Sequence, residues 1–200
     1  MGDHSQRVEA ILTSALDLAE SGGVAGVTTA ALARRLQFTE AALYRYFSGK
    51  GAIIAASLRH LGERLFTTML IELMPDAVRH GQAVEQQLTQ HVGRFAYREG
   101  LLLELLVAAA GGRDPDLHAA GDAFVRQYAQ SMAEYFAALQ KQGTIGAAAS
   151  ADDLSRLWIC QILGGFVRTR LTREVWDPIG QTGFVAFLGH LRALVAVPSA

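Results

Sequence analysis

The sequence of 200 residues contains no asparagine, one cysteine, two lysines and four prolines. A single cysteine, Cys160, excludes an intramolecular disulfide framework and a cysteine-rich zinc site. The longest apolar stretch, residues 101–110, contains Glu104 and is too short to span a bilayer. The first ten residues lack a basic region followed by an apolar run, so no signal peptide is expected. These absences favour a soluble, cytoplasmic protein without a membrane partner.

Sequence patterns of common enzymes are also missing. There is no Gly-x-Ser-x-Gly, no His-Glu-x-x-His and no P-loop. The six histidines show no pair at the three- or four-residue spacing of a helical metal site. Acidic pairs such as Asp152 and Asp153 stand at predicted helix starts, where they compensate the helix dipole. We therefore expect no enzyme, no catalytic residue, no metal and no cofactor.

The composition is that of a compact globular protein, since half of the residues are apolar and 18% are charged. The formal net charge is −1, so a nucleic-acid role would have to rest on a local concentration of basic residues. Residues 28–59 provide one, with five basic side chains and one acidic. One of the two lysines, Lys50, lies in this segment.

Apolar residues recur at three- and four-residue steps almost everywhere, and strand alternation is nearly absent. This pattern predicts an all-α protein of about nine helices, with a three-helix head over residues 1–52 and a larger helical body over residues 53–200. The helices are expected over residues 8–21, 28–35, 39–47, 49–73, 83–98, 101–110, 115–142, 150–173 and 179–197. Asp114 before Pro115, and Ser150 three residues before Asp153, are typical helix-start signals.

The second and third predicted helices are short and separated by a tight turn, which indicates a helix-turn-helix. Thr28 and Thr39 are typical N-cap residues for them, and Leu32 and Leu43 supply apolar residues for a small core. In such a unit the third helix enters the major groove of DNA. Because asparagine is absent, base reading is expected from Arg45, Gln37 or Thr39, or from methyl and shape contacts. The residues expected to contact DNA are Thr28, Thr29, Gln37, Thr39, Glu40, Ala41, Tyr44, Arg45, Tyr46 and Lys50.

The order of these residues resembles a known family. Thr-Thr-Ala-Ala-Leu-Ala from Thr28, then Thr-Glu-Ala-Ala-Leu-Tyr-Arg-Tyr-Phe from Thr39 and Lys50, is similar to the N-terminal signature of TetR-family transcriptional regulators. The resemblance covers roughly residues 7–58 without a gap. Two positions depart from the usual pattern: Gln37 replaces the glycine of the turn, and Gly51 replaces a glutamate after the lysine. A left-handed or otherwise adjusted backbone is therefore expected at Gln37, at some energetic cost.

The resemblance implies a homodimeric repressor that a small molecule releases from operator DNA. The body would hold a small apolar or aromatic ligand, and its last two helices would pair with a second subunit. The residues expected to line the ligand pocket are His91, Arg94, Phe95, Tyr128, Met132, Phe136, Trp158, Gln161 and Ile162. The residues expected at the dimer interface are Leu154, Leu157, Gly165, Val185, Leu188 and Leu191.

Two simpler or different interpretations stay open beside this one. The aromatic residues of the body have the helical spacing of an ordinary hydrophobic core, which is the more common role of such residues. The head also looks close to that of TetR-like nucleoid-occlusion proteins, which bind many chromosomal sites and act on a cell-division protein. Either DNA-binding role predicts a cytoplasmic protein associated with the nucleoid.

Overall fold

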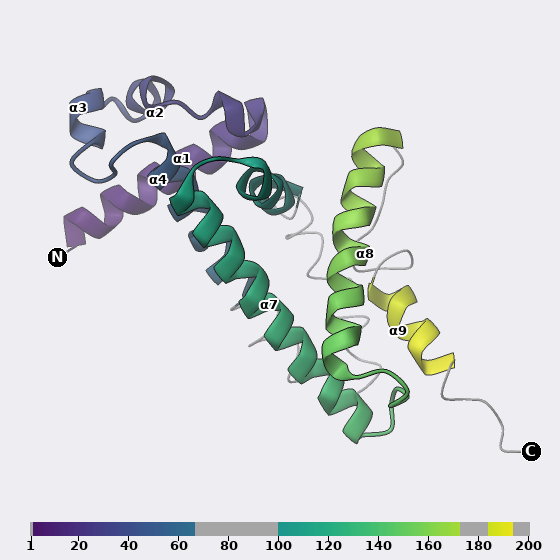
Figure 1. The fold of residues 1–200 in the computed structure, drawn as a ribbon. Coiled ribbons are helices and arrows are strands. Elements are labelled where there is room, and N and C mark those ends of the chain that lie inside the picture. Colours follow the sequence, from purple (N-terminus) through teal and green to yellow (C-terminus); the bar gives the residue numbers. More distant parts are fainter. Residues whose placement is uncertain (1, 67–99, 173–183, 194–200) are drawn as a thin grey trace, which may run out of the picture. The chain divides into compact units, whose positions relative to one another are not determined.

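The computed structural model describes residues 2–66, 100–172 and 184–193, and every regular element in these ranges is an α-helix (Figure 1). The prediction of an all-α protein is confirmed there. The predicted helix over residues 83–98 lies outside the described residues. None of the described helices is long and apolar enough to cross a membrane. The helices are α1 (Gly2–Gly26), α2 (Thr29–Leu36), α3 (Glu40–Leu43), α4 (Lys50–Phe66), a helix over residues 100–111, α7 (Pro115–Lys141), α8 (Ala151–Thr172) and α9 (Phe184–Ala193).

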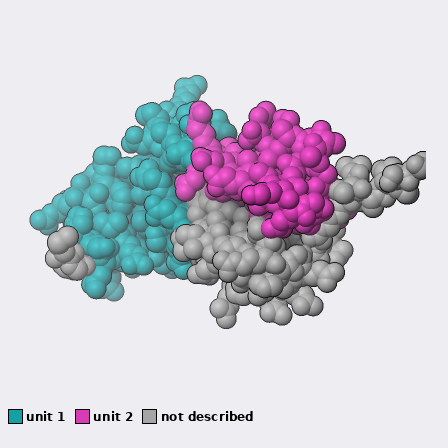
Figure 2. Space-filling view, turned by 90° about the horizontal axis from the view of Figure 1, so that it is seen from below, with its two compact units in different colours: residues 1–64, 98–124 teal, residues 65–97, 125–200 magenta. Residues whose placement is uncertain are grey.

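The chain forms two compact units, coloured separately in Figure 2. The first consists of residues 1–64 and 98–124, and the second of residues 65–97 and 125–200. The predicted head of residues 1–52 is thus smaller than the unit that contains it. Ile53, Ile54 and Leu58 of α4 explain one part of the difference, because these buried side chains belong to the core of the first unit, and residues 98–124 make up the other part.

The first unit is built around one face of α1. Ile11, Leu12, Ala15, Leu16 and Ala19 are buried and follow the three- and four-residue spacing of a helix face. The regular helix breaks at Gly23, as expected, since this glycine has φ 69° and ψ 171°. The amide of Val24, the next residue, donates to Glu104 Oε1 at 3.4 Å.

The start of α4 lies against the start of α7 in the first unit. A Cβ atom at Gly51 would overlap the carboxylate of Asp114. That carboxylate is not free to move away, because its Oδ1 atom accepts hydrogen bonds from the backbone amides of Asp116 and Leu117, both at 3.0 Å. The departure from the family pattern at residue 51 therefore has a steric reason, and the predicted cap of α7 is confirmed.

The second unit has its own core, to which α7, α8 and α9 contribute. The predicted cap of α8 is present, since the amide of Asp153 donates to Ser150 Oγ at 3.1 Å and that hydroxyl donates to Asp153 Oδ2 at 2.7 Å. The start of α8 is bonded to α7 through Ser155 Oγ, which donates to the carbonyl of Ala129 at 2.7 Å. The core cluster comprises Met132, Tyr135, Phe136, Leu139, Ile145, Leu154, Trp158 and Leu188.

Candidate DNA-binding surface

Side-chain caps define the beginnings of α2 and α3. The hydroxyl of Thr28 accepts a hydrogen bond from the amide of Ala31 at 3.1 Å, and that of Thr39 accepts one from the amide of Ala42 at 3.2 Å. Each threonine satisfies an amide that has no partner inside its own helix. Both caps predicted from the sequence are confirmed, so the two short helices begin where a helix-turn-helix requires.

The third helix is shorter than predicted. Regular α-helix ends at Leu43, and residues 44–46 form turns. The amides of Arg45 and Tyr46 donate to the carbonyls of Ala42 and Leu43, three residues back, at 3.3 and 2.9 Å. Bonds over three residues tighten the last turn relative to an α-helix. The side chains that follow Leu43 are therefore presented from a turn and not from the predicted helix through Phe47.

Of the two backbone conformations expected at Gln37, the structure has the left-handed one. Its φ and ψ are 56° and 37°, and it is the one non-glycine residue with positive φ among those described. The amide of Phe38 donates to the carbonyl of Ala33 at 2.8 Å, which is the bond that closes a Schellman-type helix end. The family's usual glycine accommodates this geometry without strain, whereas glutamine adopts it at a cost.

Replacing Gln37 with glycine is expected to increase the free energy of unfolding by about 0.5–1 kcal/mol, because the strain of a left-handed side-chain-bearing residue is removed. Urea unfolding of the two proteins measures the difference. Gln37→Ala is the matched control, since it removes the same side-chain atoms and keeps a Cβ in the left-handed backbone. A glycine variant less stable than the alanine variant would contradict this account.

Most of the residues expected to contact DNA are exposed, and they lie on and around α2 and α3. Tyr44 is 55% exposed, and Arg45 beside it is also exposed. Thr29 and Tyr46 are partly buried. The remaining exposed members of the predicted set are Thr28, Gln37, Thr39, Glu40, Ala41 and Lys50.

Besides the capping threonines, three of these side chains form hydrogen bonds within the first unit. Thr29 Oγ1 donates to Glu40 Oε2 at 2.6 Å, which connects the first residue of α2 to the first residue of α3. Lys50 Nζ donates to the carbonyl of Ala25 at 3.1 Å. The ammonium group of Lys50 is thus bonded to the C-terminal end of α1, so it is only in part available to a DNA phosphate.

The sequence analysis missed two residues of α1 that contact this surface. The ring of His4 lies 5.1 Å from that of Tyr46, centroid to centroid, and the guanidinium carbon of Arg7 lies 5.7 Å from the centroid of the Phe38 ring. The predicted first helix began at Val8, whereas α1 begins at Gly2, so His4 was not placed on any helix. The three-residue step from His4 to Arg7 would have placed both on one face.

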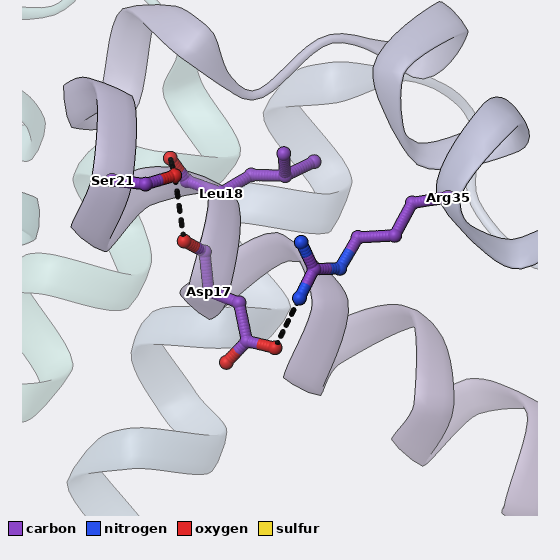
Figure 3. A network of polar contacts seen from close by, with 4 residues as sticks. All are labelled: Asp17, Leu18, Ser21 and Arg35. Carbon is purple, nitrogen blue, oxygen red and sulfur yellow. Dashed lines mark hydrogen bonds and ion pairs between the residues drawn. The ribbon is translucent and has the colours of Figure 1, made fainter.

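Arg35 on α2 is paired with a carboxylate of α1 (Figure 3). Its Nη2 atom lies 2.9 Å from Asp17 Oδ2, and the two side chains are 48% and 32% exposed. Ser21 Oγ donates to the carbonyls of Asp17 and Leu18 at 3.1 and 3.2 Å. An exposed pair of this kind contributes at most about 1 kcal/mol to stability. Arg35 therefore belongs to a solvated contact between α1 and α2.

The predicted pocket residues that the structure describes lie close together in the second unit. Met132, Phe136 and Trp158 belong to its core cluster, and Tyr128 and Ile162 pack against it. The indole nitrogen of Trp158 donates to the hydroxyl of Tyr128 at 2.9 Å, so both polar groups are satisfied among apolar neighbours. Gln161 is partly buried on α8. His91, Arg94 and Phe95 lie outside the described residues, so the pocket stays a prediction.

The predicted dimer residues differ in how far their own chain buries them. Leu154 and Leu188 are buried in the core cluster of their own chain, and Leu191 packs against it, so these side chains have little surface left for a second copy. Leu157 is 57% exposed. The side chain of Val185 lies outside the described residues. Gly165 is partly buried, whereas its neighbour Gly164 is exposed.

A second group of exposed apolar residues on α8 was not predicted from the sequence. Leu163, Val167 and Leu171 are exposed, with Leu171 at 79%. Leu157, Gly164, Val167 and Leu171 follow steps of seven, three and four residues, which places them along one stripe of the helix. The buried residues Leu154 and Trp158 face the core, so α8 carries apolar side chains in two directions.

Among the described residues, no cluster of histidine, cysteine or carboxylate side chains could hold a metal ion.

Comparison with known proteins relates the first unit to a family of regulators. The sequence model of the bacterial regulatory proteins, tetR family, matches residues 11–57. The nucleoid occlusion factor SlmA of Marinobacter nauticus is 35% identical over 112 residues, which are 56% of this chain and 56% of that protein. An HTH-type transcriptional repressor of Mycobacterium tuberculosis is 31% identical over 117 residues, covering 55% of this chain and 62% of that protein. The chain therefore spans about three-fifths of the length of these relatives.

The fold is similar over a longer stretch than the sequence. The crystal structure of a TetR-family transcriptional regulator from Agrobacterium tumefaciens matches with a TM-score of 0.69 at 14% identity, covering 99% of this chain and 100% of the other. The matched segment, residues 11–57, contains the buried face of α1, both capped helices and the left-handed turn. Residues 11–57 therefore carry the sequence pattern of the tetR family of bacterial regulatory proteins, and the all-helical fold of the chain is similar to that of the Agrobacterium tumefaciens regulator.

Proposed function

We propose that the chain is a DNA-binding transcriptional regulator in which residues 28–50 contact double-stranded operator DNA. One observation carries the proposal: two threonine-capped helices joined by a tight turn expose Tyr44 and Arg45 at the end of the second of them. This is the arrangement with which a helix-turn-helix reaches a DNA groove and backbone. The concentration of basic residues in the same segment supports it.

More specifically, we propose that the protein is a homodimeric repressor associated with the nucleoid, and that a small apolar or aromatic ligand releases it from its operator. Support for repression is the similarity to the Mycobacterium tuberculosis repressor. Support for a ligand is the aromatic neighbourhood of Tyr128, Phe136 and Trp158 in the second unit. Release requires that the ligand bind one state of the dimer more tightly than the other.

The exposed stripe of α8 supports the dimer. Isolated exposed apolar residues are ordinary on protein surfaces, but a continuous stripe on one helix marks an interaction site more often. A stripe with steps of seven, three and four residues fits an equivalent stripe of a second helix, as in a coiled coil. In a two-fold dimer the same residues would serve both subunits. Gly164 lies in the middle of the stripe and would allow the two helix backbones to approach closely.

Replacing Tyr44 and Arg45 with alanine together is expected to weaken binding to the intergenic DNA upstream of the gene by about ten- to hundredfold. Both side chains are exposed, and hydrogen bonds to charged groups such as phosphate are worth about 1.5–3 kcal/mol. An electrophoretic mobility shift at low salt measures the change, and low salt is needed because counterion release dominates such binding.

Arg64→Ala is the matched control for this variant. It removes a cation from the exposed last turn of α4, outside residues 28–50, and is expected to change affinity by less than about twofold. If the wild-type protein binds no fragment of the upstream DNA, or if the Tyr44 and Arg45 variant binds as tightly as wild type, the proposal is wrong.

A second function is favoured by the similarity to the nucleoid occlusion factor SlmA. In that case the same head would bind many chromosomal sites, and the body would act on a cell-division protein. A genome-wide binding map separates the two functions. One or a few promoter sites support the repressor, whereas dozens of scattered sites support the nucleoid-occlusion role.

A further inference from the structure

A carboxylate stands at the tip of the helix that is proposed to enter the DNA. Glu40 is the first residue of α3 and is exposed. It is the one acidic side chain among the basic residues of the segment 28–59. The neighbouring residues Thr39 and Ala41 have shorter side chains and are also exposed.

The position of this carboxylate is set by a neighbouring helix. Thr29 of α2 donates a hydrogen bond of 2.6 Å to Glu40 Oε2, a short bond of the charge-assisted kind. The Thr29 backbone is held in turn by the capped first turn of α2, where Thr28 accepts from the amide of Ala31. Oε2 is thus directed by a rigid element, and Oε1 has no donor in the described ranges of the chain.

The negative charge of Glu40 has a cost on a surface that meets phosphate. Within the part of the chain that the structure describes, no arginine, lysine or histidine forms an ion pair with it. An unpaired carboxylate is repelled by the DNA backbone at close range. Contact with a hydrogen-bond donor on a base would offset this cost, and the exocyclic amino group of cytosine is such a donor in the major groove.

We propose that Glu40 is a specificity-determining residue that accepts a hydrogen bond from the N4 amino group of a cytosine, and that Thr29 is the positioning residue that holds its carboxylate. This inference rests on the proposed DNA-binding function. It adds Glu40 to the base-reading residues expected from the sequence, which were Arg45, Gln37 and Thr39.

Selection of binding sites from a random double-stranded DNA library tests the proposal. Wild type is expected to favour cytosine at one position of each half-site by about 5- to 150-fold, the range of a good contact between a side chain and a base. Glu40→Gln is expected to lose this preference, because its amide nitrogen is a donor and favours adenine, while other positions of the site stay unchanged.

Glu9→Gln is the charge-matched control, since Glu9 is an exposed carboxylate of α1 in the same unit. It is expected to leave the base preference at every position as in wild type. For the positioning residue, Thr29→Val removes the hydroxyl with little change in shape and is expected to reduce the cytosine preference, whereas Thr29→Ser keeps the donor and retains it. Thermal unfolding verifies that each variant is folded.

The outcomes separate the inference from the function on which it rests. If wild type selects no sequence and binds no DNA at low salt, the proposed function fails. If wild type selects a sequence without a cytosine position, or if Glu40→Gln selects the wild-type sequence, the role of Glu40 is overturned and DNA binding stands. An unchanged cytosine preference in Thr29→Val overturns the role of Thr29 alone.

Discussion

Replacing Leu43 with alanine is expected to lower the free energy of unfolding by about 2–5 kcal/mol and to weaken DNA binding more than tenfold. Leu43 is the buried residue of α3 and is 1% exposed. A helix of four residues does not form by itself in water, because too few hydrogen bonds offset the entropy of its first turn. The placement of α3 therefore depends on this side chain and on the Thr39 cap.

Urea unfolding and a mobility shift measure the two effects of the Leu43 change. The affinity is corrected for the unfolded fraction, because native proteins are stable by only about 5–15 kcal/mol. Leu43→Met conserves the side-chain volume and is expected to cost less than about 1.5 kcal/mol. If the folded alanine variant bound DNA as tightly as wild type, the recognition surface would not depend on the anchoring of α3.

Replacing Leu157 and Leu171 with glutamate together is expected to convert the proposed dimer to a monomer, raising the dimer dissociation constant at least about a hundredfold. Burying one leucine side chain is worth about 1.5–3 kcal/mol. The loss of two such contacts in each subunit therefore costs more free energy than a hundredfold change in the dissociation constant represents, even before charge repulsion is counted. The monomer itself is expected to stay folded, because these side chains are 57% and 79% exposed in the single chain. Sedimentation velocity measures the change.

Gln127→Glu with Gln142→Glu is the matched control for this pair. It adds the same two negative charges at exposed positions of the second unit, at a distance along the chain from the stripe of α8. The control is expected to sediment as wild type does. A Leu157 and Leu171 variant that remained dimeric at the same concentration would assign the dimer to a different surface.

Local signals in the sequence predicted the helix starts well. Thr28, Thr39, Asp114 and Ser150 each cap the helix that follows, and each was recognisable because a short polar side chain before an apolar helical pattern has one common use. The family pattern indicated a left-handed or adjusted backbone at Gln37, and the structure has the left-handed one. Such features depend on neighbours within a few residues.

Contacts between distant segments were not predictable in the same way. The sequence alone gives no reason for a glycine at position 51, whereas the structure does, because the Asp114 carboxylate lies beside it. The pairing of His4 with Tyr46 joins residues 42 positions apart, and no periodicity indicates which residue of one helix lies against which residue of another. The core of the first unit likewise includes Ile53 and Leu58, beyond the predicted boundary of the head.

Periodicity, capping residues and the order of residues 28–50 determined by themselves that the chain is helical, that its N-terminal segment is a helix-turn-helix, and which side chains are candidates for DNA. Only the tertiary structure decided that α3 ends at Leu43, that Thr29 holds Glu40, and that one apolar side of α8 packs inside the chain while Leu157 and Leu171 stay exposed. The reason is that helix formation depends on bonds over three or four residues, whereas burial and side-chain partners depend on segments that only folding brings together.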